Sequence, residues 1–142
     1  MKAFILDAYG RGAGLRLADH PDPHPGPRDV LVRIHAAGLN PLDSKIRDGA
    51  FKPILPYRPP LILGHDLAGV VEAVGAHVTR FRPGDAVFGR PRDGRIGTLA
   101  ERLAVDEDDL ALMPSGLAMT EAAGLPLVSL TAWQALVERA DL

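Results

Sequence analysis

Alternating apolar and polar positions dominate the first two thirds of the chain and predict short β-strands. Segment 29–38, DVLVRIHAAG, places four apolar side chains on one face and Arg33 and His35 on the other. This is the period of a half-buried strand. Segments 2–9 and 15–19 flank the glycine-rich GRGAG and are expected to form a first strand pair. Further strands are expected in segments 66–75 and 97–105, and segment 80–89 is expected to form a Pro-Gly-Asp turn that leads into a short strand.

Proline-rich segments separate these strands. Residues 20–29 contain four prolines, which remove backbone donors and fix φ, so this segment is expected to be an exposed connector. A short helical turn is expected around 42–47, before a second proline-rich loop.

The pattern changes at Thr120, where a helical period begins. Leu130, Trp133, Gln134 and Val137 follow i, i+3, i+4, i+7 spacing. Thr120 can cap this helix, and Pro126 is expected to kink or split it. Several short strands that close on themselves, followed by one helix, predict a small β-barrel with a C-terminal helix.

Composition narrows the class of protein. The chain has 142 residues, of which 46% are hydrophobic and 24% charged, enough for one domain with a real core. Its apolar runs fall short of the ~18 residues that a membrane span requires, and the N-terminus lacks a cleavable leader pattern. A soluble, cytoplasmic protein is therefore expected. Since there is no cysteine, disulfides, thiolate zinc sites and thiol nucleophiles are excluded.

Charge is unevenly distributed. Six arginines lie between Arg80 and Arg102, followed by the acidic residues 106–109. Few aromatic residues interleave with them, so a solvated loop is favoured, while a phosphate-binding role remains open.

Five histidines are candidate metal ligands or catalytic groups. His20 and His24 are spaced as H-x-x-x-H, but neighbouring prolines exclude the helix that would aim both at one ion. His65 precedes Asp66 at the entrance of a predicted strand. Such a histidine is most often a hydrogen-bonded structural residue, and the residues alone leave a metal ligand or an active-site contact open.

Nucleotide and hydrolase motifs are near misses or absent. GRGAGL, residues 10–15, lies between strands instead of opening a helix, and GRPRDGR, residues 89–95, lacks the Lys and Ser/Thr of a P-loop. No G-x-S-x-G elbow is present. The glycines therefore indicate turns.

Three segments, 36–49, 63–89 and 97–142, together resemble the medium-chain dehydrogenase/reductase superfamily. The specific feature is GHD-x-x-G-x-V-x-x-V-G followed by F-x-x-GD-x-V-x-G. More narrowly, the chain looks like the zinc-independent quinone oxidoreductase and enoyl reductase branch. The resemblance implies a GroES-like catalytic domain over residues 1–119 and a connecting helix over 120–142. It also implies that the Rossmann domain lies outside this chain, so the chain is expected to be an N-terminal portion of a longer protein.

The resemblance also implies roles for particular residues. In the superfamily's zinc alcohol dehydrogenases, the histidine of the G-H-E/D motif binds metal together with a cysteine, at whose position this chain has Asn40. Zinc is therefore not expected, and His65 and Asp66 are left as polar structure beside the cleft. Asn40 and Asp43 are expected to be catalytic, with Asn40 as the donor to the substrate oxygen, and Thr131 to contact the cofactor.

The function implied is reduction of quinones, conjugated enones or related carbonyls by NADPH, or alternatively NADH, in a homo-oligomer without nucleic-acid or membrane partners. The 142-residue chain alone is expected to be inactive. A different class remains open, namely a stand-alone GroES-like binding or assembly module without redox activity.

Overall fold

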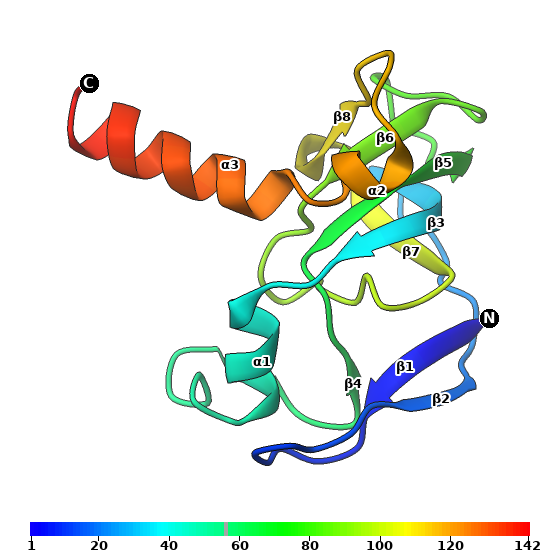
Figure 1. Ribbon diagram of the computed structural model, residues 1–142. Coiled ribbons are helices and arrows are strands. Elements are labelled where there is room, and N and C mark those ends of the chain that lie inside the picture. Colours follow the sequence, from blue (N-terminus) through cyan, green and yellow to red (C-terminus); the bar gives the residue numbers. More distant parts are fainter. Residues whose placement is uncertain (56) are drawn as a thin grey trace.

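The computed structural model describes residues 1–55 and 57–142 and shows a mainly β chain with a C-terminal helix (Figure 1). This confirms the expected fold class. The strands are β1 (Lys2–Leu6), β2 (Arg16–Asp19), β3 (Asp29–Gly38), β4 (Leu61–Ile62), β5 (Asp66–Val74), β6 (Ala86–Gly89), β7 (Arg102–Asp106) and β8 (Leu110–Leu112). The helices are α1 (Pro41–Arg47), α2 (Met119–Ala122) and α3 (Pro126–Trp133), with a 3₁₀ turn at Glu107–Asp109 and a π-helical segment at Gln134–Arg139.

The strands form two antiparallel sheets. The smaller sheet has the order β2-β1-β4, and the larger has the order β7-β3-β5-β6-β8. An isolated bridge joins Ala3 of β1 to Ala100, in the segment that leads into β7 of the larger sheet. The larger sheet ends at β7 on one side and β8 on the other, so the described strands form two linked sheets where the sequence suggested one closed barrel.

Several predicted strands are confirmed with shorter bounds. β1 and β2 pair antiparallel, with Phe4 opposite Leu17, as the segments around GRGAG predicted. In β3 the expected alternation holds, because Val30 and Val32 are fully buried while Arg33 and His35 are exposed. Segment 97–105 is a regular strand only from Arg102.

The main core lies against the larger sheet. Its buried side chains are Val30, Val32, Leu67, Val71, Phe81, Val87, Val105 and Leu110. Burial of each large aliphatic side chain contributes about 1.5–3 kcal/mol, so this sheet is a firm base for the loops at its edges. A second cluster contains Leu6, Ile46 and Leu63. It attaches α1 to the first sheet and to the segment leading into β5.

The C-terminal segment is split, as Pro126 predicted. α2 ends at Ala122 and α3 begins at Pro126, because proline favours the first helical position and disrupts a helix interior. Thr120 is not the cap. The helix begins one residue earlier, and the Glu121 carboxylate accepts the Ala118 N–H at 2.8 Å, so a backward-reaching acid caps this end.

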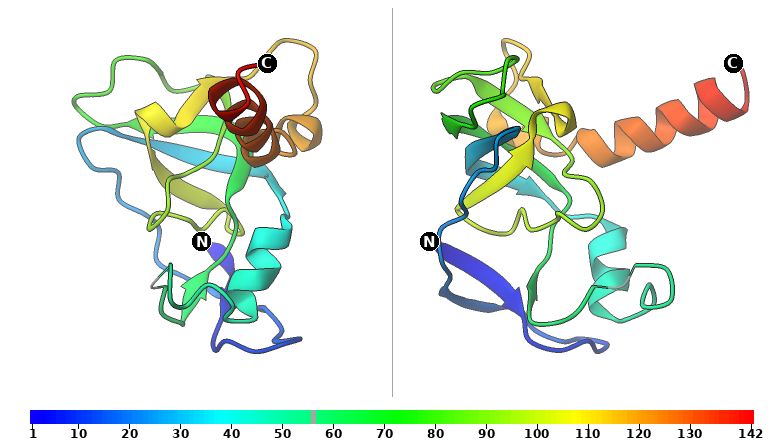
Figure 2. Two further views of the ribbon diagram at one scale, coloured as in Figure 1. Left: turned by 90° about the vertical axis from the view of Figure 1, so that its left-hand side faces the viewer. Right: turned by 180° about the vertical axis from the view of Figure 1, so that it is seen from behind.

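α3 projects away from both sheets (Figures 1 and 2). Pro126 is its buried residue and Leu127 is half-buried, while the rest of α3 is exposed. Among residues 1–55 and 57–142, no helix has the length and apolar character needed to cross a membrane.

Candidate functional site

The N-terminus of α1 holds the two residues expected to be catalytic. Asn40 immediately precedes the helix, Pro41 occupies its first position, and Asp43 lies in the first turn. The Oδ2 atom of Asp43 accepts the backbone N–H of Asn40 at 2.9 Å. This contact satisfies a donor that the helix start leaves free. Asn40 is 9% exposed and Asp43 5%.

His65 is a hydrogen-bonded partner of Asp43. Its Nδ1 lies 2.7 Å from Oδ1 of Asp43, and the imidazole has no exposed surface. Because a carboxylate accepts, Nδ1 is assigned as the donor. Gly64, with φ +107°, permits this placement, since a Cβ there would lie 2.2 Å from Oγ1 of Thr98. The structural interpretation of His65 requires a hydrogen-bond partner, and that partner is Asp43.

Two buried polar atoms, one in this pair and one next to it, have no hydrogen-bond partner among the described residues. They are Nε2 of His65 and Oγ1 of Thr98. A buried unpaired hydroxyl or ring nitrogen costs free energy. The buried region around His65 therefore contains more polar atoms than its hydrogen bonds pair.

Asp66 extends the network to the C-terminal helix. Its Oδ2 accepts the side-chain amide N–H of Asn40 at 3.0 Å, and its Oδ1 accepts the backbone N–H of Leu127 at 3.0 Å. Burial raises the pKa of Asp66 above its ordinary value, while the hydrogen bonds from Asn40 and Leu127 oppose that rise. The network therefore joins α1, the start of β5 and the start of α3.

Thr131, the expected cofactor contact, lies on the exposed part of α3. Its hydroxyl donates to the carbonyl of Leu127 at 2.7 Å. Leu127 thus connects Thr131 to Asp66, and the structure brings Asn40 and Asp43 into one buried group with Thr131 one helical turn beyond it. The roles of these three residues in catalysis and cofactor binding stay predictions.

A cavity of about 390 Å³ borders this network on the side of Thr131. It is lined by Leu42, Arg90, Asp93, Leu127, Leu130, Thr131 and Gln134. Sequence reasoning missed Arg90, Asp93 and the backbone N–H of Leu127. The first two carried a weak signal, since opposite charges three residues apart in a turn can pair, and Arg90 contacts Asp93 at 2.8 Å. A backbone N–H carries no sequence signal.

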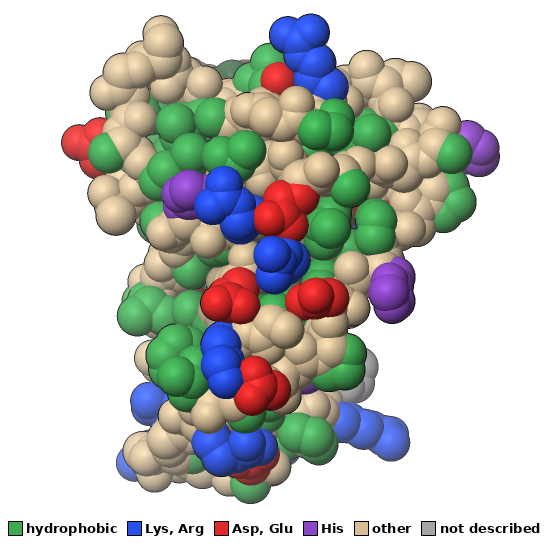
Figure 3. Space-filling view, turned by 90° about the vertical axis from the view of Figure 1, so that its right-hand side faces the viewer, with side chains coloured by type: hydrophobic (Ala, Val, Ile, Leu, Met, Phe, Trp, Pro, Cys, Tyr) green, Lys and Arg blue, Asp and Glu red, His purple; other side chains and the backbone are tan. Residues whose placement is uncertain are grey.

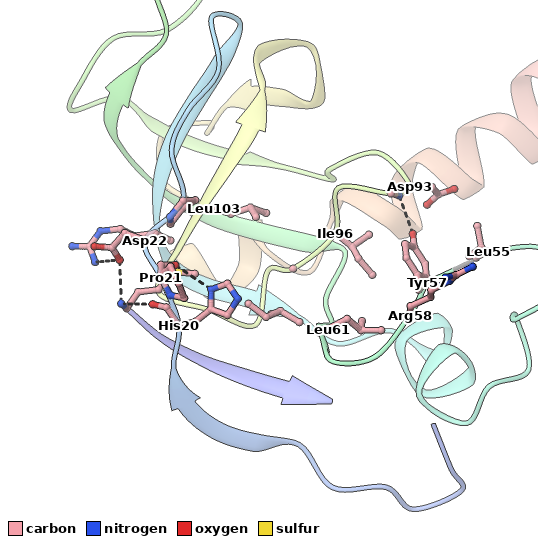
Figure 4. A pocket seen from close by; sticks show the side chains of 16 residues that line it. His20, Pro21, Asp22, Leu55, Tyr57, Arg58, Leu61, Asp93, Ile96 and Leu103 are labelled. Atoms are coloured by element: carbon pink, nitrogen blue, oxygen red, sulfur yellow. Dashed lines mark hydrogen bonds and ion pairs between the residues drawn. The ribbon is translucent and has the colours of Figure 1, made fainter. Parts of the chain in front are cut away.

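A larger cavity, of about 740 Å³, lies apart from these residues. Figure 4 shows His20 and Asp22 at one end, Tyr57 and Asp93 at the other, and Leu61 and Ile96 between them. Asn40, Asp43 and His65 line neither cavity, but the smaller one is lined by Leu127 and Thr131 and the larger one is not, so only the smaller cavity borders the network. Asp93 borders both cavities.

The arginine-rich segment pairs with acids. Each of its six arginines lies within 4.0 Å of a carboxylate: Arg80 with Asp108, Arg82 with Asp85, Arg90 with Asp93, Arg92 with Asp109, Arg95 with Asp29, and Arg102 with Glu72. On the face in Figure 3, basic and acidic side chains likewise lie next to one another. Such neutralised arginines favour a solvated surface over a phosphate site.

The donor set does not fit a zinc ion. Among the described residues, no group of three or more His, Cys, Asp or Glu side chains is arranged to hold a metal. The contact of Nδ1 with Asp43 leaves Nε2 of His65 without a partner, but a zinc site calls for three or four His, Cys or carboxylate ligands. Asn40 presents an amide that donates to Asp66, and an amide is not one of these ligands.

Comparison with known proteins places this geometry in a family context. The profile of the alcohol dehydrogenase GroES-like domain matches residues 26–115. A chloroplastic quinone oxidoreductase from Triphysaria versicolor is 38% identical over all of this chain, which spans 44% of that protein. The chain thus covers less than half the length of this curated relative.

Solved structures of related proteins are similar to this chain in fold. An alcohol dehydrogenase superfamily protein from Novosphingobium aromaticivorans matches with a TM-score of 0.92 and 46% identity, over 100% of this chain and 43% of its own. A mycobacterial protein solved in complex with NADPH matches with a TM-score of 0.87 and 30% identity, over 100% of this chain and 42% of its own.

Proposed function

The chain belongs to the alcohol dehydrogenase GroES-like domain family of the medium-chain dehydrogenase/reductase superfamily, and from this premise we propose that it is the catalytic-domain portion of a zinc-independent NAD(P)H oxidoreductase. Its proposed substrates are quinones, conjugated enones or related carbonyls. The quinone oxidoreductase name of the Triphysaria relative supports the substrate class. The mycobacterial complex supports NADPH as the reductant, with NADH as the alternative. Cytoplasmic location and homo-oligomerisation stay predictions.

The observation that carries the proposal is the buried network around Asn40. Reduction of a carbonyl or enone develops negative charge on the substrate oxygen, and an oriented N–H donor can stabilise it. One amide hydrogen of Asn40 is engaged by Asp66, and the amide nitrogen carries a second hydrogen. We assign that second hydrogen to the substrate oxygen. Asp43 orients Asn40 by accepting its backbone N–H.

The cavity beside Thr131 fits part of a nicotinamide cofactor. Its volume of about 390 Å³ lies within the range of ligand pockets. Thr131 and Gln134 offer a hydroxyl and an amide at its wall. When bound, the reduced nicotinamide supplies a hydride. The pyrophosphate of a dinucleotide calls for a glycine turn at a helix start, which this sequence does not contain. We therefore propose that the 142-residue chain alone binds NADPH poorly and is inactive.

The test is a quinone reductase assay on the longer protein that contains this chain. NADPH oxidation is followed by loss of its absorbance with 1,4-naphthoquinone, before and after exhaustive treatment with a chelator. We expect activity that survives chelation, and Asn40→Ala is expected to lower kcat on the order of 10²–10³-fold. Ser44→Ala, on the exposed side of α1, is the matched control and is expected to match wild type.

Two results would overturn the proposal. Absence of quinone-dependent NADPH oxidation in the folded longer protein would favour the binding-module alternative. Activity that disappears on chelation and returns with zinc would contradict zinc independence.

A further inference from the structure

Asp66 lies between two parts of the site that are far apart in sequence. Its carboxylate is 1% exposed, and each oxygen accepts one hydrogen bond. Oδ2 contacts the amide of Asn40, 26 positions away, and Oδ1 contacts the backbone of Leu127, 61 positions away. One carboxylate therefore fixes the distance between the residue before α1 and the first turn of α3.

The start of α3 depends on this contact. Leu125, which precedes the helix, provides no side-chain cap, and Pro126 has no N–H. Leu127 thus carries the first free N–H of the helix, and Asp66 accepts it. A carboxylate at this end also interacts favourably with the helix dipole.

Little else in the described chain holds α3. Beyond Leu127 its side chains are exposed; Leu130 retains 49% and Trp133 58% of their surfaces. A helix of this length is marginal by itself. Its direction relative to the sheets, visible in Figures 1 and 2, is therefore set at its first turn.

Close packing keeps Asp66 next to that turn. A Cβ at Gly38 would lie 2.4 Å from the carbonyl oxygen of Ala123 and 3.0 Å from Cβ of Asp66. The segment between α2 and α3 is thus pressed against the end of β3 and the start of β5. This contact leaves the carboxylate little freedom to move.

We propose that Asp66 is a positioning residue, which holds the Asn40 amide and the Thr131-bearing helix in the mutual arrangement that the reaction needs. Thr131 is included because its hydroxyl donates to the carbonyl of Leu127, the residue that Asp66 binds. This inference rests on the proposed function and deepens it. Asp66 touches neither substrate nor cofactor in this scheme and acts through Asn40 and Leu127.

The kinetic test uses Asp66→Asn in the longer protein. An amide can accept from one donor but presents its NH₂ to the other, so one link is lost. Misplacement of either group is expected to lower kcat/KM for NADPH by about 10- to 100-fold. Glu107→Gln is the matched control, because Glu107 is 2% exposed and accepts backbone N–H groups of Thr79 and Arg80 outside the site. It is expected to lower stability and leave kcat and KM unchanged.

A double-mutant comparison separates positioning from general loss of stability. If Asp66 acts through Asn40, then Asn40→Ala lowers kcat by a markedly smaller factor in the Asp66→Asn background than in wild type. Additive effects on kcat, or wild-type kinetics in a folded Asp66→Asn protein, would overturn the inference.

A second measurement does not depend on the variant folding. In the wild-type 142-residue chain, hydrogen exchange of the Leu127 amide is expected to be slower than that of Val128, the next residue of α3. Equal and rapid exchange of both amides would contradict a hydrogen bond that holds the Leu127 N–H on Asp66. Failure of the quinone reductase assay in wild type would instead refute the proposed function and leave the Leu127 result standing.

Discussion

Replacement of Asp43 by Asn tests the buried network directly. Asp43 accepts two hydrogen bonds, from the backbone of Asn40 at 2.9 Å and from the ring of His65 at 2.7 Å. Asp43→Asn keeps the shape of the side chain but leaves one acceptor oxygen for two donors. One donor must then face an NH₂ group in a site that is 5% exposed.

The expected cost follows from those two contacts. A hydrogen bond to a charged group contributes about 1.5–3 kcal/mol, and a buried donor without an acceptor costs about 1–3 kcal/mol. Since the first turn of α1 can relax, we expect a net loss of about 3 kcal/mol in the free energy of unfolding. For a chain of this size, this corresponds to a fall in Tm of roughly 6–12 °C.

The assay is urea and thermal unfolding followed by circular dichroism. Asp48→Asn is the control, since Asp48 lies at the other end of α1 and its side chain is 29% exposed in an ion pair with Arg47. Exposed pairs of this kind contribute about 0–1 kcal/mol. Equal shifts for Asp43→Asn and Asp48→Asn, with unchanged m values, would refute the assignment of a buried, energetically important network.

Three further predictions concern other parts of the molecule. Thr98→Val removes a fully buried hydroxyl without a partner and is expected to leave stability unchanged or raise it by about 1 kcal/mol in urea unfolding; a large loss would reveal an acceptor or water at this hydroxyl. Arg95 holds the pKa of Asp29 below its ordinary value of 3.8, so the stability this pair adds is present above that value and is lost as pH falls through the lowered pKa. The free energy of unfolding is therefore expected to fall less steeply with decreasing pH in Asp29→Asn than in wild type. Parallel curves for the two proteins would contradict this. The exposed apolar side chains of residues 120–142 are expected to make the isolated chain self-associate, and sedimentation as a monomer at high concentration, with slow exchange in α3, would argue against it.

Local pattern was enough for most of the strands. The alternation around Val30 and Val32 predicted a half-buried strand, and both side chains are fully buried, because successive side chains of a strand point to opposite faces. The split of the C-terminal segment at Pro126 was likewise predictable, since proline's restriction of the backbone is a property of the residue itself. Thr120 failed as a cap because the helix begins at Met119, so that Thr120 lies inside its first turn and Ala118 occupies the capping position.

The site depended on tertiary structure. Motif resemblance selected Asn40, Asp43 and Thr131, but it could not show that Asp43 binds His65 or that Asp66 binds both Asn40 and Leu127. These partners come from α1, β5 and α3, and their contacts form only when the packed sheet and the close approach at Gly38 bring those segments together. The sequence by itself determined most of the strands and the split of the C-terminal segment, because strand alternation and proline restriction are local. Tertiary structure decided which polar atoms meet, because a hydrogen bond requires atoms about 3 Å apart, and one of the atoms here is a backbone N–H that every residue except proline carries.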